Sequence, residues 1–255
     1  MSRARPTRPE RGPASGTASL SERRTPRHDR EPHAVSELKR PEVRAPFTPR
    51  PLPASFYEPS AALVAPKLLG HFLLRRTPDG SWAGGAIVET EAYLADDPAC
   101  HGFRGETARN RHMFGPPGRA YVYFIYGNYF CCNAVCAAPG VGEAVLIRAL
   151  EPAFKVEWMQ QNRPVAKPRE LTSGPAKLCL ALDIERPFGG ADLCALNSDL
   201  IVAKNPDVRQ FIRARGPIVT TTRIGLSVAE HLPLRFYLTG SEFVSRTAPR
   251  PERRR

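Results

Sequence analysis

Two pairs of strand-like segments, each interrupted by a short turn sequence, place the strongest limit on how this chain can fold. Residues 71–76 and 82–93 flank an Asp-Gly dipeptide at 79–80, and the aromatic-rich segment 121–133 contains a Gly-Asn dipeptide at 127–128. Such dipeptides between apolar segments are typical of β-hairpins, whose strands pair antiparallel. No regular alternation of strand and helix is present, so we expect a mixed α+β domain with a mainly antiparallel sheet.

The other expected elements follow from apolar spacing and from capping residues. Segment 94–120 contains Asp-Asp-Pro and Pro-Pro-Gly sequences and is expected to be irregular. We expect helices at 60–69, with Ser60 as the N-cap, at 152–161 and, capped by Ser173, at 173–182, and strands at 143–150, 220–223 and 234–238.

The two ends of the chain differ in composition from the middle. Residues 1–50 contain 8 Pro, 12 Lys or Arg and 6 Asp or Glu, and residues 246–255 contain five Arg and one Glu. Large apolar side chains are few there, so burial cannot offset the entropy lost on ordering. We predict a disordered basic tail over 1–52, a folded domain over 53–245 and a basic C-terminal tail after it. A transit peptide is a weaker interpretation because the N-terminal tail contains acidic residues.

The formal net charge of +12 indicates a polyanionic partner, nucleic acid before an anionic membrane, although most of that charge lies in the two ends. No segment approaches the roughly 20 apolar residues of a membrane span, and the N-terminus lacks the apolar region of a secretory signal. We therefore expect no membrane partner and six reduced cysteines. Cys131, Cys132 and Cys136 match no common zinc spacing, so we expect no metal and no cofactor.

Segment 86–93 contains the first candidate for acid–base chemistry. On a strand, alternation places Ile87, Glu89, Glu91 and Tyr93 on one face. A carboxylate beside an apolar pocket can act as a general base. The alternative is a solvated strand face with paired surface charges. Arg148 lies in an equally apolar run and should be paired, with Glu91 as a natural partner, unless it reaches solvent from an edge strand.

Segment 101–130 contains two features suited to nucleic acid. Arg side chains can grip phosphate oxygens in pairs, and aromatic faces can stack on bases or enter a duplex. Tyr123 and Tyr126 differ in parity, so one can face a pocket while the other projects beside the turn. A solvated loop and an aromatic core hairpin are the alternatives. The basic candidates for contact with the DNA backbone are Arg104, Arg109, Arg111 and Arg119.

Taken in order, these segments resemble the alkyladenine (3-methyladenine or methylpurine) DNA glycosylase family. The resemblance extends from about Leu68 to Arg246. The matching segments are 87–93, 109–111 with 113–114, 117–118, 121–123 with 125–127, 129–131 with 133, 146–152, 173–175 with 177–179, and 233–237. Asn128, beside the turn, replaces a residue that is commonly apolar in that family.

The resemblance implies one compact domain with a curved sheet, surrounding helices and a protruding β-hairpin that enters the minor groove. It implies a monofunctional enzyme without lyase activity that flips an alkylated or deaminated purine out of duplex DNA and hydrolyses its N-glycosidic bond. The roles carried over are Glu91 as general base, Arg148 as its partner in holding water, Tyr93, His101, Tyr123 and Asn133 as the base pocket, and Tyr126 as the intercalating residue.

The partner implied is duplex DNA containing damaged purines, bound by a monomer. We expect the protein to act where DNA lies, in the cytoplasm at the nucleoid if the source is bacterial and otherwise in the nucleus. Two non-catalytic alternatives remain: a module that binds damaged DNA or RNA, and a tRNA-binding domain like the C-terminal part of a formyltransferase. Neither would need Glu91 and Arg148 together.

Overall fold

The computed structural model describes residues 48–125, 127 and 129–245. Its centre is one curved antiparallel sheet in the order β3–β4–β5–β2–β1–β6, with β8 also paired to β2 and β7 paired to β8. The strands are β1 (Phe72–Arg76), β2 (Trp82–Tyr93), β3 (Ala120–Ile125), β4 (Tyr129–Cys136), β5 (Glu143–Phe154), β6 (Leu200–Ala203), β7 (Ile218–Thr221) and β8 (Arg235–Leu238). The predicted α+β class and mainly antiparallel sheet are confirmed.

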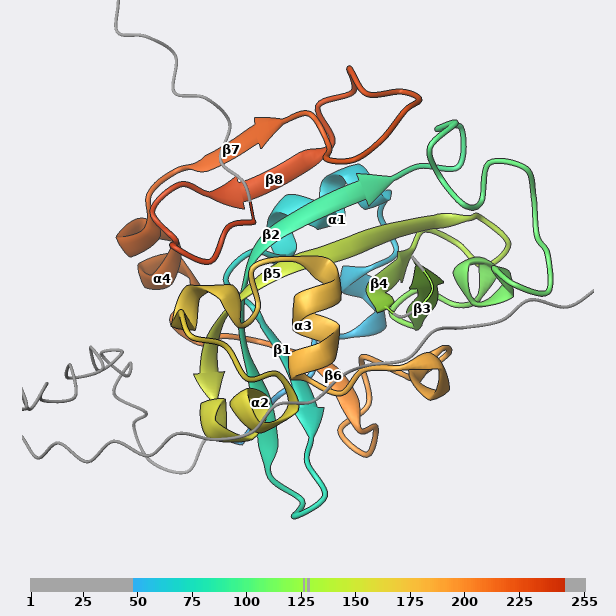
Figure 1. Ribbon diagram of the computed structural model, residues 1–255. Coiled ribbons are helices and arrows are strands. Elements are labelled where there is room, and N and C mark those ends of the chain that lie inside the picture. The colour runs from blue at the N-terminus through green and yellow to red at the C-terminus, as the bar shows by residue number, and fades with distance from the viewer. Residues whose placement is uncertain (1–47, 126, 128, 246–255) are drawn as a thin grey trace, which may run out of the picture. The chain divides into compact units, whose positions relative to one another are not determined.

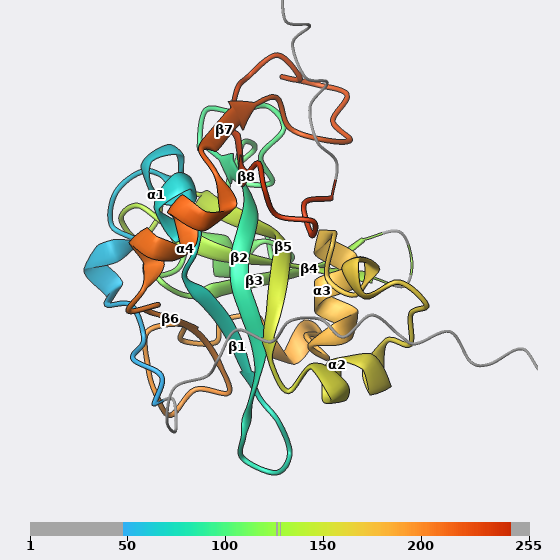
Figure 2. The ribbon, with the colours of Figure 1, turned by 90° about the vertical axis from the view of Figure 1, so that its left-hand side faces the viewer.

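Four α-helices cover the two faces of the long strands β2 and β5 (Figures 1 and 2). They are α1 (Ala61–Leu68), α2 (Val156–Asn162), α3 (Pro175–Ala181) and α4 (Val208–Arg215). Helices α1 and α4 lie on one side, and α2 and α3 on the other (Figure 2). One face of β2 packs on α1, where Thr90 donates its hydroxyl to the carbonyl of Ala65 at 2.9 Å. The side chains that alternate with Thr90 along β2 point to the opposite face, where the candidate site lies. Within the described residues no helix is long and apolar enough to cross a membrane.

Helix α1 begins where the sequence predicts, but its N-cap works differently. The side chain of Ser60 makes no capping bond to the helix backbone and instead donates its hydroxyl to Glu143 at 2.8 Å. The same carboxylate oxygen accepts the N–H of Ala61 at 2.8 Å. A carboxylate from the start of β5 therefore satisfies a free N–H of the first turn, a position that favours negative charge.

Two predicted helices are shifted because neighbouring segments pair with the sheet. The expected helix at 152–161 starts only at Val156, since β5 continues to Phe154 opposite Gly84. Ser173 forms a bridge with Ala149 and does not cap α3, whose first helical residue is a proline. Strand β6 and helix α4 were not predicted.

The edge hairpin β3–β4 has a longer turn than predicted. Ile125 pairs with Tyr129, so three residues connect the strands and the expected two-residue Gly-Asn turn is wrong. Gly127 has a φ of +78°, a conformation that glycine adopts readily. Tyr126 and Asn128 lie outside the described residues.

The described chain joins the sheet before residue 53. The N–H of Leu52 donates to the carbonyl of Val202 at 2.8 Å, and the Leu52 side chain is buried. Pro51 forms a bridge with Ala203 on the same edge strand. The segment that leads into η1 (Ala54–Phe56) is thus part of the domain.

Candidate functional site

Two carboxylates on β2 and one guanidinium on β5 form a buried ion network at the middle of the sheet. Arg148 donates from Nε to Glu89 Oε1 at 2.9 Å and from Nη1 to Glu91 Oε2 at 3.1 Å. Both carboxylates are fully buried, and Arg148 is 7% exposed. The predicted pairing of Arg148 with Glu91 is confirmed. Arg148 also has a second carboxylate partner, Glu89, which the sequence placed only on the same strand face.

Irregular pairing brings these charges together. The register of β2 against β5 shifts on both sides of Glu89, whose partner is Ala149, and the pairing skips Val88 on β2 and Arg148 on β5. Bulges change the direction of nearby side chains and are frequent beside active sites. Ile87 lies in the main core, so the polar part of the expected four-residue face begins only at Glu89, and only Tyr93 of that face lines the cavity.

Each carboxylate has further hydrogen-bond donors. Glu89 accepts from Arg235 Nε at 2.7 Å and from both the N–H and the hydroxyl of Ser245, at 2.7 and 2.9 Å. Glu91 accepts from the Tyr93 hydroxyl at 2.9 Å and from the N–H of Ile224 at 2.8 Å. Glu89 is thus held by two guanidinium groups, whereas Glu91 is held by one guanidinium and two neutral donors.

The electrostatics keep Arg148 charged and Tyr93 neutral. Burial opposes the charge on Arg148, but the carboxylates of Glu91 and Glu89 outweigh it, and its pKa is raised. Burial, followed by the negative charge of Glu91, raises the pKa of Tyr93. Tyr93 therefore remains a hydrogen-bond donor to Glu91 across the working pH range.

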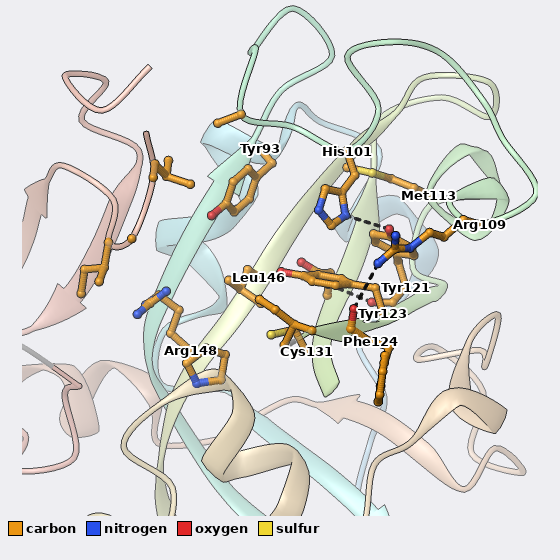
Figure 3. Close-up of a pocket in the computed structure, with 17 residues that line it drawn as sticks. Tyr93, His101, Arg109, Met113, Tyr121, Tyr123, Phe124, Cys131, Leu146 and Arg148 are labelled. Carbon is orange, nitrogen blue, oxygen red and sulfur yellow. Dashed lines mark hydrogen bonds between the residues drawn. The ribbon is translucent and has the colours of Figure 1, made fainter. Parts of the chain in front are cut away.

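A cavity of about 560 Å³ opens beside this network, within the usual range for small-molecule sites (Figure 3). Tyr93 from β2 and Tyr123 from β3 point into it, His101 lies beside them, and Arg148 closes one end. The ring of His101 meets the edge of Tyr123 with centroids 4.5 Å apart. Glu91 does not line the cavity itself, but its buried carboxylate bonds to Tyr93 and Arg148, which do line it.

One wall of the cavity is arranged around His101. Its Nδ1 lies 2.9 Å from the hydroxyl of Tyr121. Burial lowers the pKa of His101 and the positive charge of Arg109 lowers it further, so the ring stays neutral at neutral pH. Burial raises the pKa of Tyr121 to about 12. The wall therefore presents a neutral imidazole at a fixed position.

Asn133 is buried on β4 and also lines the cavity. Its Nδ2 donates to the carbonyl of Tyr121 at 2.8 Å, which fixes the amide against the neighbouring strand. The amide thus presents a polar group at a set place in a mainly apolar lining.

The loop after β7 was not predicted as part of the site. Ile224, Gly225 and Leu226 line the cavity, and the preceding Arg223 forms a buried ion pair with Asp97, donating from Nη2 at 3.0 Å. The guanidinium of Arg223 lies 4.6 Å from the ring centroid of Tyr93. No local pattern identifies this loop, because its place depends on a pair more than 120 residues apart.

The four predicted DNA-contacting arginines lie at different places. Arg109 lines the main cavity, and its Nη2 donates to the carbonyl of Phe124 at 3.3 Å. Arg111 and Arg119 line a separate hollow, and Arg119 pairs with Asp192 at 3.2 Å. Arg104 is exposed on the loop before η2 (Arg111–Phe114). The four candidates thus line or flank different hollows, and their contact with DNA stays a prediction. Tyr126 lies outside the described residues.

Comparison with known proteins identifies the family. The methylpurine-DNA glycosylase family model matches residues 55–242. Three similar relatives are each named "Putative 3-methyladenine DNA glycosylase". The proteins from Methanoculleus marisnigri and Carboxydothermus hydrogenoformans are 48% and 47% identical, over 76% of this chain and 98% of the relative. The protein from Francisella tularensis is 47% identical, over 72% of this chain and 92% of the relative. The chain therefore belongs to the methylpurine-DNA glycosylase family.

Proposed function

We propose that this protein removes alkylated or deaminated purines from duplex DNA by flipping the damaged nucleotide into the cavity beside Arg148. The family and the names of the relatives support a DNA glycosylase. A glycosidic bond within stacked DNA is out of reach of an enzyme, so the nucleotide must leave the stack. The aromatic side chains of Tyr93 and Tyr123 suit a flat base, and attract a cationic one most strongly.

Glu91 is the proposed general base. Its Oε1 accepts one described hydrogen bond, from Ile224, and so retains capacity for a water molecule. The carboxylate takes a proton from this water as the oxygen bonds to C1′ of the deoxyribose. The C1′–N bond breaks and its electron pair leaves with the base. The sugar passes through an oxocarbenium-like state, which a nearby negative charge stabilises.

The protonation state of the flipped nucleobase decides whether its departure needs a general acid. A cationic base such as 3-methyladenine departs as a neutral molecule, so no acid is required. Arg148 holds Glu91 in place while the water reacts. The mechanism uses water and no amine nucleophile, and the expected product is an abasic site with an intact strand.

Selection against normal bases is assigned to His101 and Asn133. The Asn133 amide is fixed by its bond to β3, and we expect it to clash with the 2-amino group of an undamaged guanine. His101 is proposed to hydrogen-bond the flipped nucleotide. Weakly paired damaged bases also cost less to extrude, which adds to selectivity.

The observation that carries this proposal is the contact of a buried carboxylate, Glu91, with Arg148 at the edge of an aromatic cavity. The test is single-turnover excision from duplexes containing 3-methyladenine, hypoxanthine or ethenoadenine. Glu91→Gln should still bind lesion duplex but excise about 10²–10⁴ times more slowly, the usual contribution of a general base. Wild-type rates in this variant would refute the mechanism. Lesion binding without excision by the wild-type protein would favour the non-catalytic module.

The intercalating role of Tyr126 stays a prediction, tested by comparing duplex with single-stranded substrate. Tyr126→Ala should lose excision from duplex DNA while keeping excision from a single strand, where there is no stack to refill. An unchanged ratio between the two substrates would remove Tyr126 from the mechanism. Deletion of residues 1–47 should leave single-turnover excision nearly unchanged.

A further inference from the structure

A second hollow lies directly beside the cavity and has no role in the proposed chemistry. It measures about 380 Å³ and is lined by Arg109, Val122, Tyr123, Phe124, Phe130 and Arg186. Strand β3, strand β4 and the short helix η4 (Arg186–Phe188) together supply most of this lining. It is therefore an aromatic hollow with a guanidinium at each side.

The charge of this hollow is positive. None of its lining residues is acidic, and Arg186 is exposed and makes no ion pair with any residue that the structure describes. The hollow that contains Arg119 differs, because Asp192 pairs with that arginine and Glu106 also lines the wall. Two guanidinium groups near each other without a carboxylate favour an anionic ligand, and phosphate suits their planar fork best.

The hollow adjoins the base cavity. Arg109, Tyr123 and Phe124 line both spaces. Arg109 donates to the carbonyl of Phe124. The guanidinium of Arg186 lies 6.0 Å from the ring centroid of Phe124. Both arginines therefore lie near Phe124, at the place where the two spaces share their lining.

We propose that this hollow binds a backbone phosphate of the damaged strand, next to the flipped nucleotide, through Arg186 and Arg109. The inference rests on the proposed function, since a flipped nucleotide stays joined to its neighbours and its strand must leave the cavity. Arg109 at the shared rim directs that strand into the hollow, and the rings of Phe124 and Phe130 pack against its sugar. Arg186 is thus a DNA-binding residue that the sequence did not reveal.

The first experiment measures equilibrium affinity for an uncleaved lesion duplex at several KCl concentrations. Arg186→Ala should weaken binding by roughly five-fold and reduce the slope of log K against log [KCl] by about 1, the value for one lost phosphate contact. Arg186→Lys should retain the slope with weaker binding, because it keeps the charge and loses the fork. Arg213→Ala is the matched control, since Arg213 is exposed on α4, on the opposite side of the molecule from β3 in Figure 1.

The second experiment locates the phosphate. One phosphate at a time, on either side of the lesion, is replaced by an uncharged methylphosphonate. At a single position on the damaged strand, the penalty of Arg186→Ala should disappear. A penalty that is the same at every position, or a salt slope equal to that of wild type, overturns the proposal. Failure of the wild-type protein to prefer lesion duplex would instead count against the proposed function.

Discussion

The floor and the wall of the cavity are held in different ways. The floor is the ion network of Glu89, Glu91 and Arg148 on two paired central strands, of which only Arg148 lines the open space, and every charged group there has an opposite charge within 3.1 Å. The wall consists of rings from a loop and an edge hairpin, where His101 contacts Tyr123 by its edge and Tyr121 by one hydrogen bond. One region is fixed by charge and sheet pairing, the other by packing.

This difference predicts two kinds of variant. A change in the floor leaves a buried charge without its partner, so stability and excision should fall together. A change in the wall leaves the sheet intact, so recognition of the lesion should change with little loss of stability. The following variants test that separation, from the largest expected effect to the smallest.

Arg148→Met should have the largest effect. It keeps most of the side-chain volume but leaves two buried carboxylates facing each other, and we expect the free energy of unfolding to fall by about 3–5 kcal/mol. Excision should be lost as well. Urea denaturation and single-turnover excision measure the two effects. Arg148→Lys should recover part of the stability, because it keeps the charge but reaches only one carboxylate well. Normal stability in Arg148→Met would show that ion pairing does not hold the floor.

Glu89→Gln should have a smaller effect on stability and should separate positioning from binding. Arg148 and Arg235 lose their shared counter-charge, at a cost of about 2 kcal/mol. Misplacement of Arg148 should slow excision about ten-fold at saturating protein, with affinity for lesion duplex nearly unchanged. Glu151→Gln is a matched control on the same sheet, because Glu151 pairs with Arg215 away from the cavity, at 2.9 Å. Glu151→Gln should lose stability without slower excision. If excision slowed equally in both variants, the role of Glu89 would be structural only.

Arg109→Ala should shift the pH dependence of lesion recognition. Burial and the Arg109 charge lower the pKa of His101 from its ordinary value of 6.5, so recognition of a cationic base should fall only when the pH drops below that value. Without the Arg109 charge, the pKa of His101 rises toward its ordinary value, and the loss should begin at a higher pH. The measurement is the ratio of affinities for lesion and undamaged duplex between about pH 5 and 8. If His101→Gln showed the same dependence of this affinity ratio on pH as the wild-type protein, His101 would not be the group that titrates.

Tyr121→Phe should have the smallest effect. It removes one hydrogen bond to His101, worth about 1 kcal/mol, and leaves the ring packing unchanged. We expect a few-fold loss of discrimination between hypoxanthine and guanine, with an unfolding midpoint close to that of wild type. A large loss of stability here would mean that the wall is held by the same kind of network as the floor.

Local patterns predicted the parts of this site that depend on strand alternation. The spacing of Glu89, Glu91 and Tyr93 put them on one face, and the apolar surroundings of Arg148 required a buried partner. The bulges at Val88 and Arg148 could not be predicted, because a bulge is a property of two paired strands. The carboxylate of Glu143 makes the capping bond expected of the Ser60 side chain for a similar reason, since Glu143 lies 82 residues beyond Ala61, whose N–H it accepts.

Contacts between distant segments account for most of what the sequence did not reveal. The loop that supplies Ile224 reaches Glu91 only because Arg223 pairs with Asp97 across the top of the sheet. Arg186 has no distinctive neighbours in the sequence, and its place beside Phe124 becomes visible only when η4 packs against β3. Tertiary packing decides these positions.

The bonds from Ser245 to Glu89 have a practical consequence for making the protein. The N–H and the hydroxyl of this residue both donate to the buried carboxylate, and its hydroxyl also lies 3.4 Å from Nη2 of Arg148. A gene trimmed at the last strand, β8, would still encode the whole sheet but would remove these donors. Expression boundaries and C-terminal affinity tags should therefore be placed beyond Ser245.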